Sequence, residues 1–402
     1  MHRSAVRAWQ LVRVPAIGVC LALMIAPSAG GTPADHVTAI SSGQGATFPA
    51  TGNSGLGEGF YPRLVQVQGA RRRDPNLLAT FQRGGSGLIF ESKDGGNSFT
   101  PRASIDAANG PNTKLCCTAL FALPTRLGHL RRGTLLWAGS MTLQQDPLQM
   151  RLGIWRSQDG GRTWIDHGSC ATGAGGLWEP QLLVTANRSL VCLYSDETQQ
   201  PTHSQVINET ISHDGGFTFG PPRAVVVLDS NVLRPGMPTV ARLPDGTWRM
   251  TYEVCNSSPH CQVRMKNSGD GIDWGDPRAQ GDWVVAADGS YFTHTPVLSW
   301  SRYGGREGTL ILSGQIYNDA TGAPSMRNGR TLLINRSGGK GAWLPIDAPV
   351  AVASPVDDYC QNYSSPVLAL GGRKILEFAT AWDGSTCTVR FARGLLPAVH
   401  DP

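Results

Sequence analysis

Two glutamates occupy places where a pair of carboxyl groups could do chemistry. Glu179 stands directly before the apolar run that starts at Pro180, and Glu253 closes the second apolar run of the next repeat. Two carboxyl groups across a pocket suit the hydrolysis of a glycosidic bond, because one donates a proton to the leaving oxygen while the other attacks the sugar or activates water. The alternative for each glutamate is an ion pair with an arginine at the rim of the fold.

Further charged residues are expected on the face that holds this pair. Asp196 and Glu197 end the second apolar run of the repeat that carries Glu179, and Arg63 lies at the start of the earliest run. Arg63 could bind a hydroxyl or carboxylate of a substrate, or it could neutralise a glutamate. Asp74 is expected on the same face.

Aromatic and imidazole side chains stand beside corresponding positions. Trp178 precedes Glu179 and could stack on a sugar ring or pack in the core. Tyr363 lies just before the run at Pro366 and is expected to point towards the same centre, with a hydrogen-bonded core tyrosine as the alternative. His294 is a candidate polar residue of the pocket, and a structural role also fits it.

Six apolar runs of similar design would position these residues. Each starts at Pro or a small residue, alternates, and is followed after a turn by a second apolar run, as antiparallel strands are. The spacings are 56, 62, 58, 58 and 70 residues, and the runs start at Pro62, Thr118, Pro180, Pro238, Pro296 and Pro366. This period predicts an all-β fold, a six-bladed β-propeller. The residues just before the runs should converge on its axis: Tyr61, Cys117, Glu179, Met237, Thr295 and Ser365.

A second repeated motif supports the same architecture. Ser157–Trp164 reads Ser-x-Asp-x-Gly-x-Thr-Trp, the Asp-box pattern, and 92–99 and 212–219 repeat it at spacings of 65 and 55 residues. Degraded copies lie at 267–274 and 336–343. Ser and Asp side chains bond nearby backbone N–H groups and glycine permits positive φ, so each box predicts a tight turn between the third and fourth strands of a blade.

The last blade predicts how the ring closes. It has three strands and no box, and a spare strand near Phe48 could supply the fourth. The chain then divides into a signal peptide (1–30), a linker with the ring-closing strand (31–56), and the catalytic propeller (57–402).

The first residues have the pattern of a secretory signal. Three arginines precede a short apolar run, and Ser28-Ala29-Gly30 offers a cleavage site. Cys20 could belong to a lipoprotein signal, but its apolar neighbours favour a plain signal core. The run is too short to span a membrane, and no later segment is long and apolar enough. We therefore expect a secreted, extracellular monomer.

Charge excludes some partners. The net charge of +5 falls to about +2 when the three arginines leave with the signal, which argues against nucleic acid and anionic membranes. The sequence predicts an oligosaccharide or polysaccharide as the partner, with no cofactor.

The cysteines predict disulfides rather than a metal site. Nine are present and eight remain without Cys20, an even number that suits an exported chain. Cys255–Cys261 and Cys360–Cys387 are the expected pairs by proximity within a blade, whereas adjacent Cys116 and Cys117 are not expected to bond each other. A metal site is the weaker alternative, because no C-x-x-C pair or histidine cluster is present.

The motifs resemble a known family. Asp boxes on a propeller are similar to the sialidase superfamily, and Gly176–Val184 and Met250–Cys255 more closely resemble glycoside hydrolase family 93. The resemblance covers nearly the whole mature chain. It implies a six-bladed, retaining exo-α-L-arabinanase that releases arabinobiose from the non-reducing end of linear α-1,5-arabinan. The family's catalytic glutamates would fall on Glu179 and Glu253, and its active-site tyrosine on Tyr363. By analogy with sialidases we expect Glu179 as the nucleophile, and the reverse assignment stays open.

Two other functions remain as alternatives. A sialidase-like glycosidase would need three arginines for the substrate carboxylate, and only Arg63 matches, since Leu193-Tyr194-Ser195 stands where the second should end its strand. A non-catalytic glycan-binding propeller would keep the boxes without needing the carboxylate pair.

Overall fold

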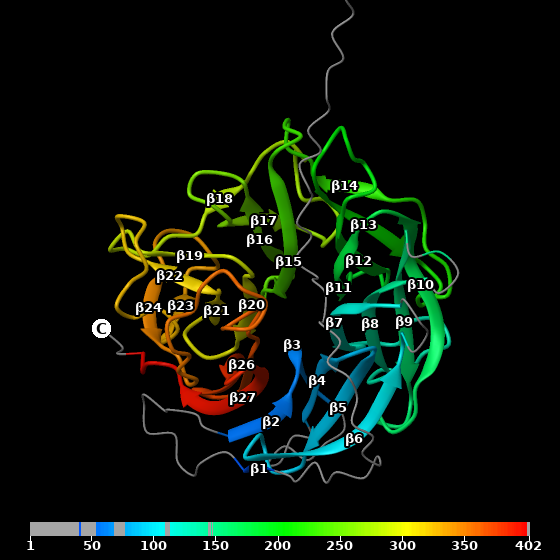
Figure 1. Ribbon diagram of the computed structural model, residues 1–402, viewed down its shortest axis with the longest axis horizontal. Coiled ribbons are helices and arrows are strands. Elements are labelled where there is room, and N and C mark those ends of the chain that lie inside the picture. The colour runs from blue at the N-terminus through cyan, green and yellow to red at the C-terminus, as the bar shows by residue number, and fades with distance from the viewer. Residues whose placement is uncertain are drawn as a thin grey trace, which may run out of the picture. The chain divides into compact units, whose positions relative to one another are not determined.

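Six antiparallel sheets surround a central axis in the computed structural model (Figure 1). The structure describes residues 40–41, 54–67, 77–108, 113–143, 146 and 148–399, all within the compact unit His36–Pro402. None of these residues lies in an α-helix, so no described helix could span a membrane. The prediction of an all-β, six-bladed propeller is confirmed. The expected signal peptide, Phe48 and Asp74 lie outside the described residues.

Each blade is a meander whose first strand lies nearest the axis. Blade one is β3 (Phe60–Gln66), β4 (Leu77–Arg83), β5 (Ser86–Ser92) and β6 (Ser98–Asp106), with β1 (Ile40–Ser41) outside β6. Blade two is β7 (Leu115–Ala122), β8 (Leu135–Thr142), β9 (Gln149–Ser157) and β10 (Ile165–Ala174). Blade three is β11 (Leu177–Val184), β12 (Leu190–Asp196), β13 (Val206–Ser212) and β14 (Arg223–Val226).

The remaining blades follow the same order. Blade four is β15 (Arg234–Arg242), β16 (Trp248–Cys255), β17 (Gln262–Ser268) and β18 (Asp282–Trp283). Blade five is β20 (Val297–Ser301), β21 (Thr309–Ser313), β23 (Thr331–Asn335) and β24 (Leu344–Asp347). A short extra pair, β19 (Tyr291–Thr293) and β22 (Ile316–Asn318), extends the sheet of blade four.

Blade six closes the ring with strands from both ends of the chain. It contains β25 (Val367–Gly371), β26 (Lys374–Asp383) and β27 (Thr386–Leu395), and its outer strand is β2 (Ser54–Glu58). Ser54 pairs with Phe391 in antiparallel register. An N-terminal strand therefore does complete the last blade, but it lies further along the chain than the segment near Phe48 that the sequence favoured.

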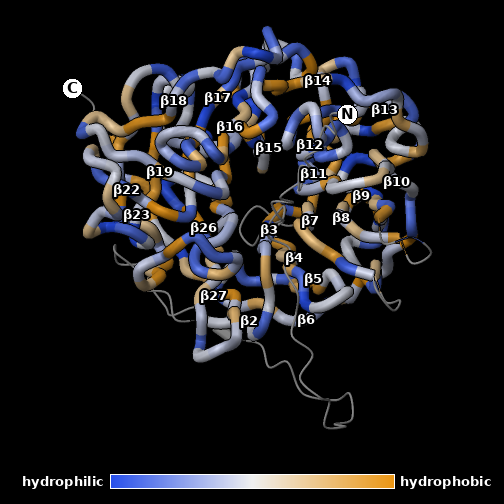
Figure 2. The backbone as a smooth tube through the Cα atoms, turned by 45° about the horizontal axis from the view of Figure 1, so that its top comes forward, coloured by the Kyte–Doolittle hydropathy of each residue, from blue (hydrophilic) through white to orange (hydrophobic). Residues whose placement is uncertain are grey.

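The cores lie between neighbouring blades, which explains the continuous apolar runs. All residues of β12 are buried, because a second strand in a propeller is covered by a blade on each side. Trp137 of β8 is fully buried, and its Nε1–H donates to Thr80 Oγ1 of blade one at 3.1 Å. Apolar stretches follow many of the strands in Figure 2, while many connections at the rim are hydrophilic.

The box turns lock the third strand to the fourth in the manner expected of their residue types. In the turn after β9, Ser157 Oγ accepts from Gly161 N–H at 2.8 Å, while Asp159 Oδ1 accepts from the backbone of Arg162 and Thr163. Burial alone would raise the pKa of Asp159, but these hydrogen bonds outweigh it and hold the pKa below its usual value. In blade five Asn335 Oδ1 replaces the serine and accepts from Gly339 N–H at 2.8 Å.

A repeated kink aims one residue of each first strand at the axis. In blades one to four the pairing of the first two strands shifts register at this point, as in a β-bulge. The residue in the kink has a positive φ near 55° in every blade: Tyr61, Cys117, Glu179, Met237, Thr295 and Ser364. Five are the residues expected from the sequence, and in blade six the kink falls on Ser364 rather than Ser365. Left-handed backbone at a bulky residue is costly, and it recurs where a fold presents functional side chains.

Candidate active site

Glu179 sits in the kink of blade three, with φ 57°. Its Oε2 accepts hydrogen bonds from Ser195 Oγ–H and from Met237 N–H, the latter at 3.1 Å and from the next blade. Burial raises the pKa of Glu179 and the charge of Glu197 adds to the rise, while the two hydrogen bonds act in the opposite direction. The half-buried carboxyl is thus held by donors that favour its ionised form.

Glu253 lies near the end of β16 and pairs with Gly236, next to the kink residue Met237. Its Oε2 accepts from Thr295 N–H of the following blade at 2.6 Å. Burial raises the pKa of Glu253 to about 8, and the negative charges of Glu179 and Asp357 contribute to that rise. Glu253 has one hydrogen bond from a neighbouring blade where Glu179 has two donors, so hydrogen bonds stabilise the ionised form of Glu253 less.

The two glutamates meet because both occupy repeated positions. Gln82, Ser195 and Glu253 lie opposite the residue before the kink in blades one, three and four, and each accepts the N–H of the kink residue in the next blade. Glu179 is itself a kink residue. Met237 N–H donates to both Ser195 Oγ and Glu179 Oε2, directly beside the residue that pairs with Glu253. The expected placement of both carboxyl groups at one end of adjacent blades is therefore what the structure has.

Tyr363 lies at the same centre, on the loop before β25. Its Oη–H donates to Met237 Sδ at 3.9 Å, and its ring centroid lies 6.1 Å from that of Tyr61. Tyr61 is buried, and burial raises its pKa, partly offset by Arg63 and increased by Glu179 and Glu253. The Arg63 guanidinium stacks on the Tyr61 ring at 4.1 Å and donates to the backbone oxygen and Oγ of Ser364, at 3.0 and 2.9 Å. Arg63 thus joins blade one to blade six beside the pair.

The acidic residues of blade three take different places. Asp196 is buried, and its carboxylate accepts from Asn208 Nδ2 and Thr198 N–H, both at 2.7 Å, so it holds the blade together. Glu197 forms an ion pair with Arg234 at the start of β15. The charge of Arg234 lowers the pKa of both Glu179 and Glu253. Sequence reasoning missed Arg234, although its place shortly before the kink residue Met237 could have indicated it.

Trp178 is half-buried and packs against the core cluster between blades two and three. Its indole lies over Gly176, where an added Cβ would come within 2.2 Å of Nε1 and 2.4 Å of Glu197 Oε2. Gly176 therefore allows Trp178 and Glu197 to lie side by side at the rim next to Glu179.

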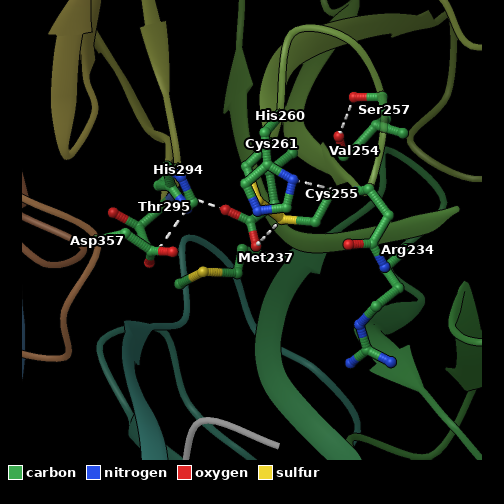
Figure 3. The surroundings of a disulfide bond; sticks show 12 residues. Arg234, Met237, Val254, Cys255, Ser257, His260, Cys261, His294, Thr295 and Asp357 are labelled. Atoms are coloured by element: carbon green, nitrogen blue, oxygen red, sulfur yellow. Dashed lines mark hydrogen bonds and ion pairs between the residues drawn. A yellow bond between two sulfur atoms is a disulfide. The ribbon is translucent and has the colours of Figure 1, made fainter. Parts of the chain in front are cut away.

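His294 lies at the entrance to blade five, near Asp357 and His260 (Figure 3), and one of its ring nitrogens lies within 4.8 Å of a carboxylate oxygen of Glu253. It is 8% exposed, its Nδ1 lies 3.6 Å from Asp357 Oδ1, and its ring meets His260 edge to face at 5.3 Å between centroids. Burial lowers the pKa of His294, and His260 lowers it further, against the charge of Asp357. Sequence reasoning missed Asp357 and His260, which are brought here only by packing between blades.

Two groups of side chains here could hold a metal by proximity. Ligand atoms of His260, His294 and Asp357 lie within 4.8 Å of one another. However, His260 Nδ1 accepts from Asn256 N–H at 3.1 Å, which places the proton of a neutral ring on Nε2, so neither ring nitrogen has a free lone pair for a metal. The second group, Glu253, Cys255, Cys261 and His294, contains the two sulfurs of a disulfide, which are not thiolate ligands.

Four disulfides join the cysteines of the described chain. Cys255–Cys261 and Cys360–Cys387 were expected and are confirmed, and Cys170–Cys192 bridges blades two and three. The expectation that Cys116 and Cys117 would not bond each other was wrong. Side chains alternate between faces in a regular strand, but Cys117 is the kink residue of blade two, with φ 59°. The kink breaks the alternation and lets neighbouring sulfurs meet.

Solved structures similar to this chain include arabinan-degrading enzymes and sialidases. No protein-family model matches the sequence, and a search of curated proteins gave no match. An α-L-arabinanase of Penicillium chrysogenum, solved with arabinobiose, is 26% identical over 88% of this chain and 96% of its own, with a TM-score of 0.70. The GH93 α-L-arabinofuranosidase of Fusarium graminearum, also solved with arabinobiose, is 22% identical over 88% and 98%, with a TM-score of 0.67.

The sialidase NanB of Streptococcus pneumoniae is more distant. It is 10% identical over 91% of this chain and 71% of its own, with a TM-score of 0.56, so it shares the fold alone. The resemblance to glycoside hydrolase family 93, within the sialidase-like propellers, is thereby confirmed.

Proposed function

We propose that this protein is a secreted, retaining exo-glycosidase that hydrolyses linear α-1,5-L-arabinan from the non-reducing end. The similarity to arabinanase and arabinofuranosidase structures supports a glycosidase. The observation that carries the proposal is the pair Glu179 and Glu253, held at one end of adjacent blades with both pKa values raised by burial.

The contacts of the two carboxyl groups support a division of roles between them. Glu179, stabilised as a carboxylate by Ser195 and Met237, attacks the anomeric carbon, while Glu253 gives its proton to the leaving oxygen as the glycosidic bond breaks. Glu253, now ionised, then takes a proton from water, whose oxygen displaces Glu179 from the sugar. This route requires carboxyl groups about 5–5.5 Å apart, whereas inversion would need roughly 6.5–9.5 Å.

The charged groups around the pair favour a neutral sugar over a sialic acid. Arg63 donates to Ser364 and Arg234 is paired with Glu197, so both arginines beside the pair already bind protein acceptors. A substrate carboxylate would have to compete with these contacts and approach two glutamates. Export is supported by the four disulfides, which suit an oxidising compartment.

The deciding experiment compares linear arabinan with a fluorogenic sialoside as substrates of the purified protein. We expect arabinobiose from arabinan and no release from the sialoside. Glu179→Ala and Glu253→Ala should each lower kcat by several orders of magnitude without loss of folding. Azide should then rescue Glu253→Ala with retained configuration and Glu179→Ala with inverted configuration. Hydrolysis of the sialoside alone would favour the sialidase alternative, and binding of glycans without turnover would favour a glycan-binding propeller.

A further inference from the structure

An exposed tyrosine stands at the rim of blade six, on the loop that carries Tyr363. Tyr359 is 44% exposed. Its ring lies between Phe60, with centroids 5.5 Å apart, and Trp382, which it meets edge to face at 5.3 Å. Three aromatic rings from β3, β26 and the connecting loop thus form one cluster, which we call the aromatic rim.

The loop that presents Tyr359 is held rigidly from several sides. Asp358 accepts from Trp382 Nε1–H at 2.9 Å and from Cys360 N–H at 2.8 Å. Gln315 Nε2 donates to the backbone oxygens of Val356 and Asp358, and the disulfide Cys360–Cys387 ties the loop to β27. The exposed ring is therefore presented in a defined orientation, as a preorganised binding group is.

The aromatic rim continues into the candidate active site. Phe60 is the residue before Tyr61, whose ring lies 6.1 Å from that of Tyr363. Trp382 stands near the end of the second strand of its blade, and Glu253 stands near the end of the second strand of blade four. Since second strands all run towards one face of a propeller, the aromatic rim and the glutamates share that face.

We propose that the Tyr359 ring is a platform on which a sugar residue of the substrate chain stacks, beyond the three residues of the shortest chain that can release arabinobiose. A sugar ring offers an apolar face of C–H groups, which an exposed aromatic ring with a fixed orientation covers well. This inference rests on the proposed glycosidase function and adds a chain-binding site to it.

The test compares short and long substrates in one pair of variants. For a long arabino-oligosaccharide, Tyr359→Ala should raise KM roughly three- to tenfold, the range expected for one lost aromatic stacking contact, with kcat unchanged. The shortest cleaved substrate should show the wild-type KM, and Tyr359→Phe should behave as wild type on both. Phe217→Ala is the matched control, because Phe217 is 50% exposed in the box turn of blade three, away from the glutamates.

Two outcomes would overturn the inference. One is an unchanged KM of Tyr359→Ala for the long substrate, and the other is an equal loss on the shortest substrate, which would mark a structural role. If the wild type does not hydrolyse arabinan, the proposed function fails. Calorimetry then measures the binding of linear neutral oligosaccharides and tests the Tyr359 platform independently of hydrolysis. Binding that weakens in Tyr359→Ala and not in Phe217→Ala supports it, and no binding by the wild type rejects it.

Discussion

We expect kcat/KM to fall as the pH rises above about 8, because Glu253 must carry a proton to act as the acid. Burial raises its pKa from 4.5 to about 8. At pH 7 a group with that pKa is roughly nine-tenths protonated, whereas an ordinary glutamate is protonated only to about 0.3%. The environment of Glu253 therefore increases the reactive acid form roughly 300-fold at neutral pH.

The charged groups around Glu253 predict in which direction the alkaline limb of the pH profile should move when each is removed. Asp357→Asn removes a negative charge that raises the pKa of Glu253, so the alkaline limb of the pH profile should move to lower pH. Arg234→Met removes a positive charge that lowers it, so the limb should move to higher pH. Asp229→Asn is the control, because that carboxylate is 74% exposed and paired with Arg278. His294 should not contribute to this limb, because its pKa is lowered and its ring is neutral there.

The assay is kcat/KM for a linear arabino-oligosaccharide between pH 4 and 10 at constant ionic strength. Circular dichroism at each pH separates loss of activity from unfolding. An alkaline limb near pH 4.5 would show that Glu253 titrates as an exposed glutamate does. A shift to higher pH in Asp357→Asn, a shift to lower pH in Arg234→Met, or a comparable shift in Asp229→Asn would show that the assigned electrostatic causes are incorrect.

Three further predictions concern stability and processing. Glu377 is 2% exposed, accepts one hydrogen bond from Val350 N–H and has its pKa raised by burial to about 8. Its carboxyl loses the proton above about pH 4.5 in the unfolded chain but only above about pH 8 in the folded protein, so the wild type should lose roughly 3 kcal/mol of unfolding free energy relative to Glu377→Gln between pH 4.5 and 7. Denaturant titration measures this difference, and the exposed Glu58→Gln variant should show no such trend. Asp159→Ala should lower the unfolding free energy by roughly 1–3 kcal/mol, because it leaves the N–H groups of its box turn without their acceptor; an unchanged denaturation midpoint would contradict this. The mature N-terminus should lie near residue 31 and the native protein should contain no titratable thiol, which N-terminal sequencing and thiol titration check; about eight thiols would contradict the disulfides.

The sequence by itself determined the architecture and the common face of the two glutamates. Box turns are made by side chains a few residues from the backbone groups that they bind, so Ser157 and Asp159 specify their turn locally. The repeated apolar runs indicate the number of blades, because each strand must show alternating or continuous apolar residues along its own length and can be recognised by them. Strand direction in a meander then placed Glu179 and Glu253 at the same end.

Only the tertiary structure decided what surrounds those glutamates. Asp357 acts on Glu253 from the loop between blades five and six, and Arg234 acts on it from the first strand of its own blade. Asp196 is buried against Asn208 instead of facing the axis. The kink at Cys117 allowed a bond between neighbouring cysteines that a regular strand would forbid. These features depend either on how separate segments of the chain are placed or on a left-handed residue within a strand. Packing between blades supplies the energy that maintains both kinds of feature. Neither kind therefore leaves a periodic or local signal in the sequence.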